Sequence, residues 1–304
     1  MLATVLQLAL LFMFILCGFL LGKLKKVPME KSSLLSMLLA NVFLPSKVFL
    51  SFSSRCTPEY FKTNFPTLLI SLGMLLFLVA FSLFVSKLFT KEPYTRNVYR
   101  YSFTISNYAY LGYVLVEAVL DPQALTDMIL FCIPFSFYTY SFGYALLNNK
   151  GSLWKKTLNP MTIAIFVGLL FGVLEIPVPS FLQNALNAAS SCTGPLSMLL
   201  TGLVVAAMPW KALIPDLKTW LFSAMRLVVI PAILWGLCYL LRICGLITDA
   251  VYPSAVIMGS MSCGLNTIVF PSLVGEDCSM GARYVLVTNI LCLATIPMWI
   301  ALVT

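Results

Sequence analysis

The chain has 304 residues, of which 60% are hydrophobic and only 10% are charged, and its mean hydropathy is +0.96. Soluble domains carry roughly 25% charged residues, so this composition excludes an ordinary soluble protein and predicts a multi-pass membrane protein. The net charge of +8 does not indicate a nucleic-acid partner, because the lysines and arginines lie in short segments between apolar runs.

The first apolar run, residues 2–22, carries no positive charge. The lysines at 23, 25 and 26 follow it, which is the reverse of the order in a cleavable signal peptide. We therefore expect a first transmembrane helix at the N-terminus.

Ten apolar runs have about the length, roughly 20 residues, that a membrane helix needs. They cover residues 2–22, 32–54, 64–89, 98–119, 125–148, 158–176, 181–208, 219–243, 250–275 and 281–303. The predicted fold class is therefore an all-α membrane protein with ten transmembrane helices. The connections are short, and the central one is 149–158.

The charges of the connections predict the orientation. Counted together with the span ends beside them, the odd-numbered connections carry 14 lysines and arginines and the even-numbered ones carry 3. Because cytoplasmic loops are enriched in Lys and Arg, we expect the odd-numbered connections to lie in the cytoplasm. We expect the protein to lie in the inner or plasma membrane of the cell. Both termini would then lie outside.

Five spans per half predict an inverted repeat, since an odd number of spans reverses the orientation of the second half. The halves would be 1–148 and 159–304, joined by the linker 149–158. The second span carries Pro45 and the seventh carries Pro195, each near the middle.

Matching interruptions break the fourth and ninth spans, at 106–112 and 260–267, and each contains an asparagine. Asn107 lies 104 residues after Ala3, where the first apolar run opens, and Asn266 lies 107 residues after Asn159. Broken backbone persists in a membrane only where it lines a cavity or binds something, and paired breaks indicate a transporter's binding site. We predict that the half-helix N-termini there supply four partial positive ends around one cavity.

An asparagine side chain supplies two donors and an acceptor without the cost of burying a charge. It suits a carboxylate ligand, although a helix-capping role is the alternative for each asparagine alone. Neither interruption contains Asp or Glu, which argues against obligatory proton or sodium coupling at this point.

Lys47 and Arg226 are the cations that lie inside predicted spans and away from their ends. For Arg226 the favoured interpretation is snorkelling to the cytoplasmic headgroups. For Lys47 two interpretations stay open: it attracts an anion or pairs with Glu117, or it packs without such a role. Tyr140 belongs to the polar segment 138–141, for which hydrogen bonding between helices is favoured over substrate contact.

Nine cysteines form no CxxC pair, and histidine is absent from the sequence. This pattern predicts neither a metal site nor a cofactor. No nucleophile and base pair is visible, so an enzyme is not expected.

Several motifs resemble the auxin efflux carrier family over nearly the whole chain. They are Asn41-Val-Phe-Leu-Pro45, Asn107-Tyr-Ala-Tyr-Leu-Gly112, Leu158-Asn-Pro160, Gly194-Pro-Leu196, Arg226-Leu-Val-Val-Ile-Pro231, Met261-Ser-Cys-Gly-Leu-Asn266, Gly275-Glu-Asp277 and Thr295-Ile-Pro297. Tyr113 and Ser262 stand where the family often has crossover prolines, and the long hydrophilic central loop of the plant members is missing. The resemblance implies a fold like that of bile-acid and sodium/proton antiporter-type carriers, with a scaffold domain (spans 1, 2, 6, 7) and a transport domain (spans 3–5, 8–10), in a homodimer.

The sequence therefore predicts a membrane carrier that exports or exchanges small carboxylates by elevator-type alternating access, with its site where spans 4 and 9 cross. The candidate substrate-binding residues are Asn107, Asn266, Tyr108, Ala109, Thr267, Asn41, Pro45, Lys47 and Tyr140. The rivals are a sodium- or proton-coupled carrier of the same fold and a non-transporting membrane receptor or enzyme.

Overall fold

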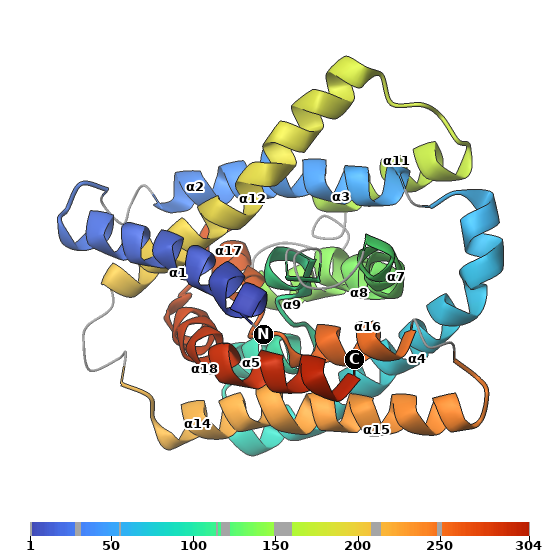
Figure 1. The fold of residues 1–304 in the computed structure, drawn as a ribbon. Coiled ribbons are helices and arrows are strands. Elements are labelled where there is room, and N and C mark those ends of the chain that lie inside the picture. The colour runs from blue at the N-terminus through green and yellow to red at the C-terminus, as the bar shows by residue number, and fades with distance from the viewer. Residues whose placement is uncertain are drawn as a thin grey trace.

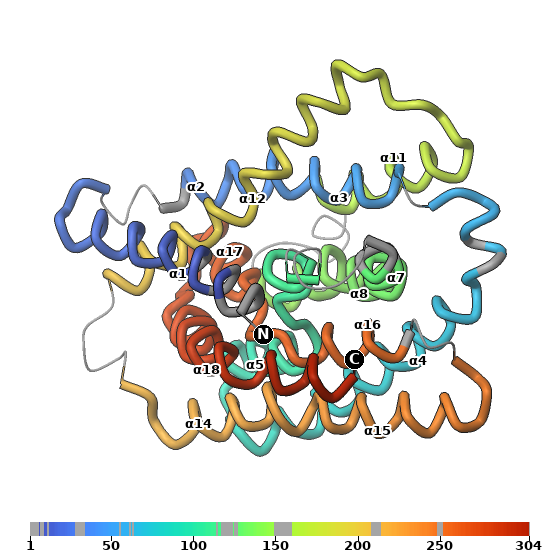
Figure 2. The backbone as a smooth tube through the Cα atoms, viewed as in Figure 1, coloured from blue at the N-terminus to red at the C-terminus, as the bar shows by residue number. Residues whose placement is uncertain are grey.

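The computed structural model describes residues 2–27, 32–54, 56–113, 115–116, 122–148, 160–207, 214–247 and 251–303. These residues are helical apart from short connections. The predicted linker 149–158 and Glu117 lie outside the described residues. Along the chain the helices alternate between two packed groups, as the tube in Figure 2 traces.

The first group lies along the top and left of Figure 1 and comes from the predicted spans 1, 2, 6 and 7. Its elements are α1 (Leu2–Lys23), α2 (Ser32–Leu38), the π-helix η2 (Leu39–Phe43), α3 (Leu44–Ser53), α11 (Pro160–Val173) and α12 (Ser180–Ala207). Helix α1 packs against α12, and α3 packs against α11 and α12.

The second group comes from the other predicted spans. Its elements are α4 (Pro58–Phe89), α5 (Pro93–Thr104), η3 (Tyr108–Gly112), α7 (Pro122–Phe131), α8 (Ile133–Tyr138), η4 (Thr139–Gly143), α9 (Tyr144–Leu147), α14 (Leu217–Ala224), η5 (Met225–Val229), α15 (Ile230–Ile243), α16 (Val251–Ser260), α17 (Asn266–Leu273) and α18 (Ser279–Val303). Helix α4 packs on α5 and α8, while α16 packs on α15, α18 and α7. A scaffold and a transport domain, and the inverted repeat, remain predictions.

Five described stretches are long and apolar enough to cross a membrane: Leu34–Ser53, Asn64–Phe89, Ser180–Ala207, Leu217–Ile243 and Ser279–Val303. Phe12–Lys23 and Pro160–Val173 are shorter apolar stretches. The count of ten spans therefore stays a prediction. The predicted fourth and ninth spans are divided into short pieces, as their interruptions suggested.

Helices α1 and α12 approach so closely that glycine is required at the contact. A Cβ atom on Gly18 would lie 2.2 Å from the carbonyl oxygen of Leu199, and one on Gly202 would lie 2.1 Å from that of Ile15. Small residues let membrane helices pack backbone to backbone, so these glycines bring α1 and α12 together.

A π-turn precedes a proline in each of two helices, η2 before Pro45 and η5 before Pro231. Proline has no N–H to donate to the carbonyl four residues earlier. In the second case that carbonyl, on Leu227, accepts a hydrogen bond of 2.8 Å from the Trp299 indole. The side chain of α18 thus satisfies the backbone group that Pro231 leaves without its helical donor.

Candidate functional site

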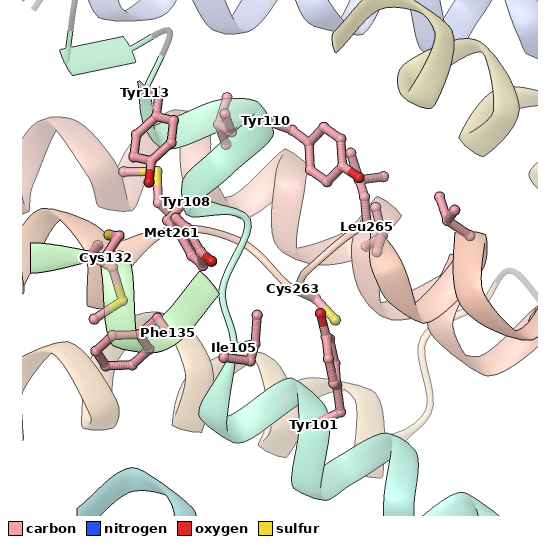
Figure 3. Packing of buried hydrophobic residues seen from close by; sticks show 14 of the residues in the cluster. Tyr101, Ile105, Tyr108, Tyr110, Tyr113, Cys132, Phe135, Met261, Cys263 and Leu265 are labelled. Atoms are coloured by element: carbon pink, nitrogen blue, oxygen red, sulfur yellow. The ribbon is translucent and has the colours of Figure 1, made fainter. Parts of the chain in front are cut away.

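The two predicted interruptions meet inside the second group. Residues 105–107 separate α5 from η3, and residues 261–265 separate α16 from α17. Ser106 and Cys263 form an antiparallel bridge, in which the Asn107 N–H donates to the Ser262 carbonyl at 2.9 Å. Figure 3 shows the two extended segments passing each other. The first break is shorter than predicted, because residues 108–112 wind into η3.

Helix ends of both signs meet at this crossing. Helices α5 and α16 end there, whereas η3 and α17 begin there. Each break therefore contributes one partly negative C-terminus and one partly positive N-terminus. The expectation of four positive ends was wrong, because a helix interrupted once has only one new N-terminus.

Arg226 lies at the two negative ends. Its guanidinium donates to the carbonyl oxygens of Phe103, Gly259 and Met261, each at 3.2 Å. Phe103 is in the last turn of α5 and Gly259 in the last turn of α16, where carbonyls have no helical partner. One cation thus caps both C-termini and ties the two broken helices together.

The snorkelling interpretation of Arg226 was wrong. The residue is 0% exposed, and its three contacts run inward to the crossing. The position of Arg226 near the end of its predicted span suggested that its side chain reaches the lipid headgroups. Instead, Arg226 is buried in η5, and its guanidinium bonds carbonyls of α5 and α16. The sequence signal was present, since an intramembrane cation usually has a partner that compensates its burial.

The two asparagines lie at the positive ends, and both are buried. Asn107 precedes η3, and its Nδ2 lies 3.4 Å from the Ser262 hydroxyl, while its Oδ1 is buried without a hydrogen-bond partner. No side chain of a capping residue bonds the N-terminus of η3 or of α17. Helix capping, the alternative role, is therefore not what these amides do in this conformation.

Asn266 is held between two tyrosines. Its Oδ1 accepts from the Tyr110 hydroxyl at 3.0 Å, and its Nδ2 donates to the Tyr101 hydroxyl at 3.1 Å. Figure 3 shows the rings of Tyr101 and Tyr110 approaching the Cys263–Leu265 segment from opposite sides. Neither tyrosine was predicted as a site residue, although Tyr110 lies in the first predicted interruption, because the sequence does not indicate which side chain a tyrosine hydroxyl reaches.

Lys47 connects the first group to the first break. Its ammonium donates to the carbonyl oxygen of Ala109 at 2.7 Å and lies 6.0 Å and 5.8 Å from the ring centres of Tyr110 and Tyr113. Both rings lie within the range of a cation–π interaction. The predicted pairing with Glu117 lies outside the described residues.

A small cavity lies beside Lys47, lined also by Ala109, Tyr113, Ser136 and Tyr140. Its volume of about 20 Å³ is enough for about one water molecule. The structure thus brings the predicted site residues Lys47, Ala109 and Tyr140 around one space, and it is closed to a carboxylate-sized molecule.

The other predicted site residues are distributed around this centre. The Tyr108 hydroxyl lies 3.0 Å from that of Ser136, and the Thr267 hydroxyl donates to the Gly264 carbonyl at 2.8 Å. Pro45 lies in the first turn of α3. Asn41 is exposed on η2, and its amide donates to the Met37 carbonyl at 2.8 Å, so the structure does not bring it to the breaks.

The whole sequence was compared with known proteins. A family model described as membrane transport protein matches residues 3–152 and 148–300, which together cover nearly all of the chain. The chain belongs to this family, the auxin efflux carrier family. Comparison with curated protein sequences gave no match. Membership of this family and the five long apolar helices identify a multi-pass membrane protein of a transporter family.

In the described part of the chain, no group of three His, Cys, Asp or Glu side chains could hold a metal ion.

Proposed function

We propose that this membrane transport protein carries small organic anions, specifically carboxylates, and binds them where the two breaks cross. The observation that carries the proposal is the division of the crossing into two sides. Arg226 neutralises the C-terminal ends, while the N-terminal ends keep their positive field and face the buried amides of Asn107 and Asn266.

Asn107 has unused hydrogen-bonding capacity at this place. A half-turn of its amide would let the Ser262 hydroxyl donate to Oδ1 and would place Nδ2 where the partnerless Oδ1 now lies. Amide nitrogens donate, and a carboxylate accepts. Asn266 would join by exchanging its bond to the Tyr101 hydroxyl for one to the ligand.

Substrate entry would require the two groups of helices to separate. The cavity at Lys47 has room for about one water molecule. The hydrogen bond from Lys47 to the Ala109 carbonyl joins α3 of the first group to η3 of the second. In our proposal, the second group moves as an elevator past the first, breaks this contact and carries the anion across. Export or exchange are the two modes consistent with such a cycle.

The alternative is a sodium- or proton-coupled carrier of the same fold. We favour uncoupled transport because Arg226 already supplies a fixed positive charge to the C-terminal ends, where a bound inorganic cation would otherwise be stabilised. The breaks themselves contain no acidic residue.

Counterflow in proteoliposomes tests this proposal. Vesicles holding the purified protein are loaded with unlabelled mono- or dicarboxylates and placed in trace labelled carboxylate, with identical sodium and pH on both sides. Labelled anion should accumulate transiently with at least one carboxylate, and a sodium ionophore or a protonophore should leave it unchanged. Accumulation that appears only with an imposed ion gradient would establish the coupled alternative, and a lack of exchange with every carboxylate tested would reject the substrate class.

A further inference from the structure

A second and larger cavity lies away from the crossing, between α4, α5 and the segment from α8 to α9. Its volume is about 480 Å³. Its lining includes the polar residues Arg100, Asn97 and Ser82. It also includes apolar residues, among them Leu83 and Phe142. A cavity of this size, with a few polar groups in an otherwise apolar lining, is suited to a ligand that has a polar head and an apolar body.

Arg100 leaves part of its guanidinium without a partner. One terminal nitrogen donates to the Asn97 side-chain oxygen at 3.3 Å, whereas Nε is buried and has no hydrogen-bond partner. Within the described ranges Arg100 forms no ion pair. A buried N–H without a partner is costly, so an oxygen-bearing anion in the cavity would compensate both the unmet donor and the charge.

The apolar residues Phe142 and Leu83 of the lining are exposed on the surface of the protein. Phe142 is 63% exposed and Leu83 is 42% exposed. Leu83 belongs to the stretch Asn64–Phe89 of α4, the most hydrophobic of the membrane-spanning candidates, with a mean hydropathy of 2.8. Farther along this helix Phe84 and Leu88 are 75% and 84% exposed. In a membrane, exposed apolar side chains on a spanning helix contact acyl chains, so Leu83 and Phe142 would bring the cavity lining into contact with lipid.

The polar residues Arg100 and Ser82 of the lining lie near the ends of their helices. Arg100 is seven residues after Pro93, where α5 begins, and Ser82 is seven residues before Phe89, where α4 ends. At 1.5 Å per residue both lie about 10 Å from their helix ends. Lys87 and Lys91 lie in the chain at the end of α4, and basic residues beside a membrane helix attract anionic lipids.

The segment that follows α9 in the chain does not suit the cavity. Residues 149–159 carry three lysines and no acid, so the Arg100 charge would repel them. A small soluble anion would satisfy Arg100 but leave the apolar wall uncovered. We infer that the cavity binds an anionic membrane lipid, whose phosphate accepts hydrogen bonds from Arg100 and whose acyl chain lies along Leu83 and Phe142.

Thermal unfolding and native mass spectrometry on the purified full chain test this inference. The probes are phosphatidylglycerol, phosphatidylcholine with the same acyl chains, and inorganic phosphate, each added to protein in a neutral detergent. Phosphatidylglycerol should raise the melting temperature with concentration and remain bound in the mass spectrum. Phosphatidylcholine and inorganic phosphate should do neither. Equal effects of the two lipids, or a full shift with phosphate alone, would overturn the proposal.

Matched variants locate the site. Arg100→Gln should lose at least half of the phosphatidylglycerol shift. Arg96→Gln, on the same helix, should keep it, because Arg96 donates to the Thr90 and Lys91 carbonyls. Phe142→Glu keeps Arg100 but adds a negative charge on the apolar wall, and should abolish lipid retention. If both Arg100→Gln and Phe142→Glu respond to phosphatidylglycerol as the unmodified protein does, the cavity is not the lipid site.

Discussion

The two sides of the crossing are built differently although the same two breaks form them. On one side the C-termini of α5 and α16 meet a fully buried arginine that donates to three carbonyls. On the other side the N-termini of η3 and α17 meet asparagines and tyrosine hydroxyls that carry no formal charge.

In our proposal, this difference gives charge-poor spans a binding site of one sign. Crossing two broken helices produces negative and positive ends in equal number. A permanently charged guanidinium cancels the negative pair, and its planar fork reaches several carbonyls at once. The positive pair is left without a counter-charge, and in our account the substrate supplies it.

The largest effect is expected on the free energy of unfolding when Arg226 is substituted. Arg226→Ala leaves three buried carbonyls without their donor, and at about 1–3 kcal/mol for each unmet group the free energy of unfolding should fall by about 3 kcal/mol or more. Arg226→Lys keeps the charge but not the fork, so its loss should be intermediate. Thermal and denaturant unfolding measure both variants.

Arg242→Ala is the matched control, because Arg242 lies at the end of α15 and stacks on Tyr252. We expect it to change the unfolding free energy by less than about 1 kcal/mol. If Arg226→Ala is no less stable than this control, Arg226 does not hold the crossing together.

A substitution of Lys47 tests whether a cation on the side of the crossing where η3 and α17 begin also contributes to carboxylate binding. Lys47→Ala should weaken carboxylate binding about tenfold, because two unit charges about 10 Å apart at an effective dielectric of about 20 attract each other by roughly 1.7 kcal/mol. The dependence of affinity on salt should also become weaker. Titrations at low and high ionic strength give both quantities, and unchanged values would assign Lys47 to packing.

A substitution of Tyr101 should change carboxylate affinity in the opposite direction to that of Lys47. Its hydroxyl accepts a hydrogen bond from the Asn266 Nδ2. Tyr101→Phe removes this competitor, so carboxylate affinity should rise about fivefold, which corresponds to ~1 kcal/mol for one hydrogen bond. Binding titrations on the variant measure the change. A fall in affinity would mean that the Tyr101 hydroxyl itself contacts the ligand.

The smallest effect is expected at Asp216, which lies outside the crossing. It caps α14 and accepts from the Thr219 N–H at 2.8 Å and the Thr219 hydroxyl at 2.6 Å. These bonds, chiefly the one from the hydroxyl, lower the pKa of its carboxyl group. A lowered folded-state pKa stabilises above the ordinary value near 4, and this contribution is lost as pH falls through the folded-state pKa.

Asp216→Ala should therefore cost ~1 kcal/mol of stability at pH 7. The gap to the unmodified protein should shrink when melting is measured below about pH 4. Carboxylate affinity at neutral pH should not change. A variant that loses affinity would indicate that the site extends to this end of α14.

The sequence predicted the features that depend on composition and local chemistry. Apolar runs gave most helix positions, and the polar interruptions at Asn107 and Asn266 gave the two breaks that the structure brings together. Long-range partners were not predictable in this way. The contacts of Arg226 with Phe103 and of Tyr110 with Asn266 join segments more than 100 residues apart, and no local pattern encodes which carbonyl or amide a side chain meets.

Local irregularity was also invisible. The π-turn η3 lies inside the predicted first interruption, and η5 lies inside an apolar run, but nothing in the local sequence marks either as a π-turn. Because residues 108–112 form η3, the first break is shorter than predicted. The snorkelling interpretation of Arg226 was wrong because its partners are carbonyls from distant segments.

The asparagine pair tests the central claim most directly. Melting temperatures of Asn107→Ala and Asn266→Ala are measured with and without a transported carboxylate, over a concentration series that also yields affinity. Because a hydrogen bond to a charged ligand contributes roughly 1.5–3 kcal/mol, each variant should bind about 10- to 100-fold more weakly while its ligand-free melting temperature changes little. Variants that melt at lower temperature but bind the carboxylate normally would show that the asparagines stabilise the breaks and do not bind the substrate.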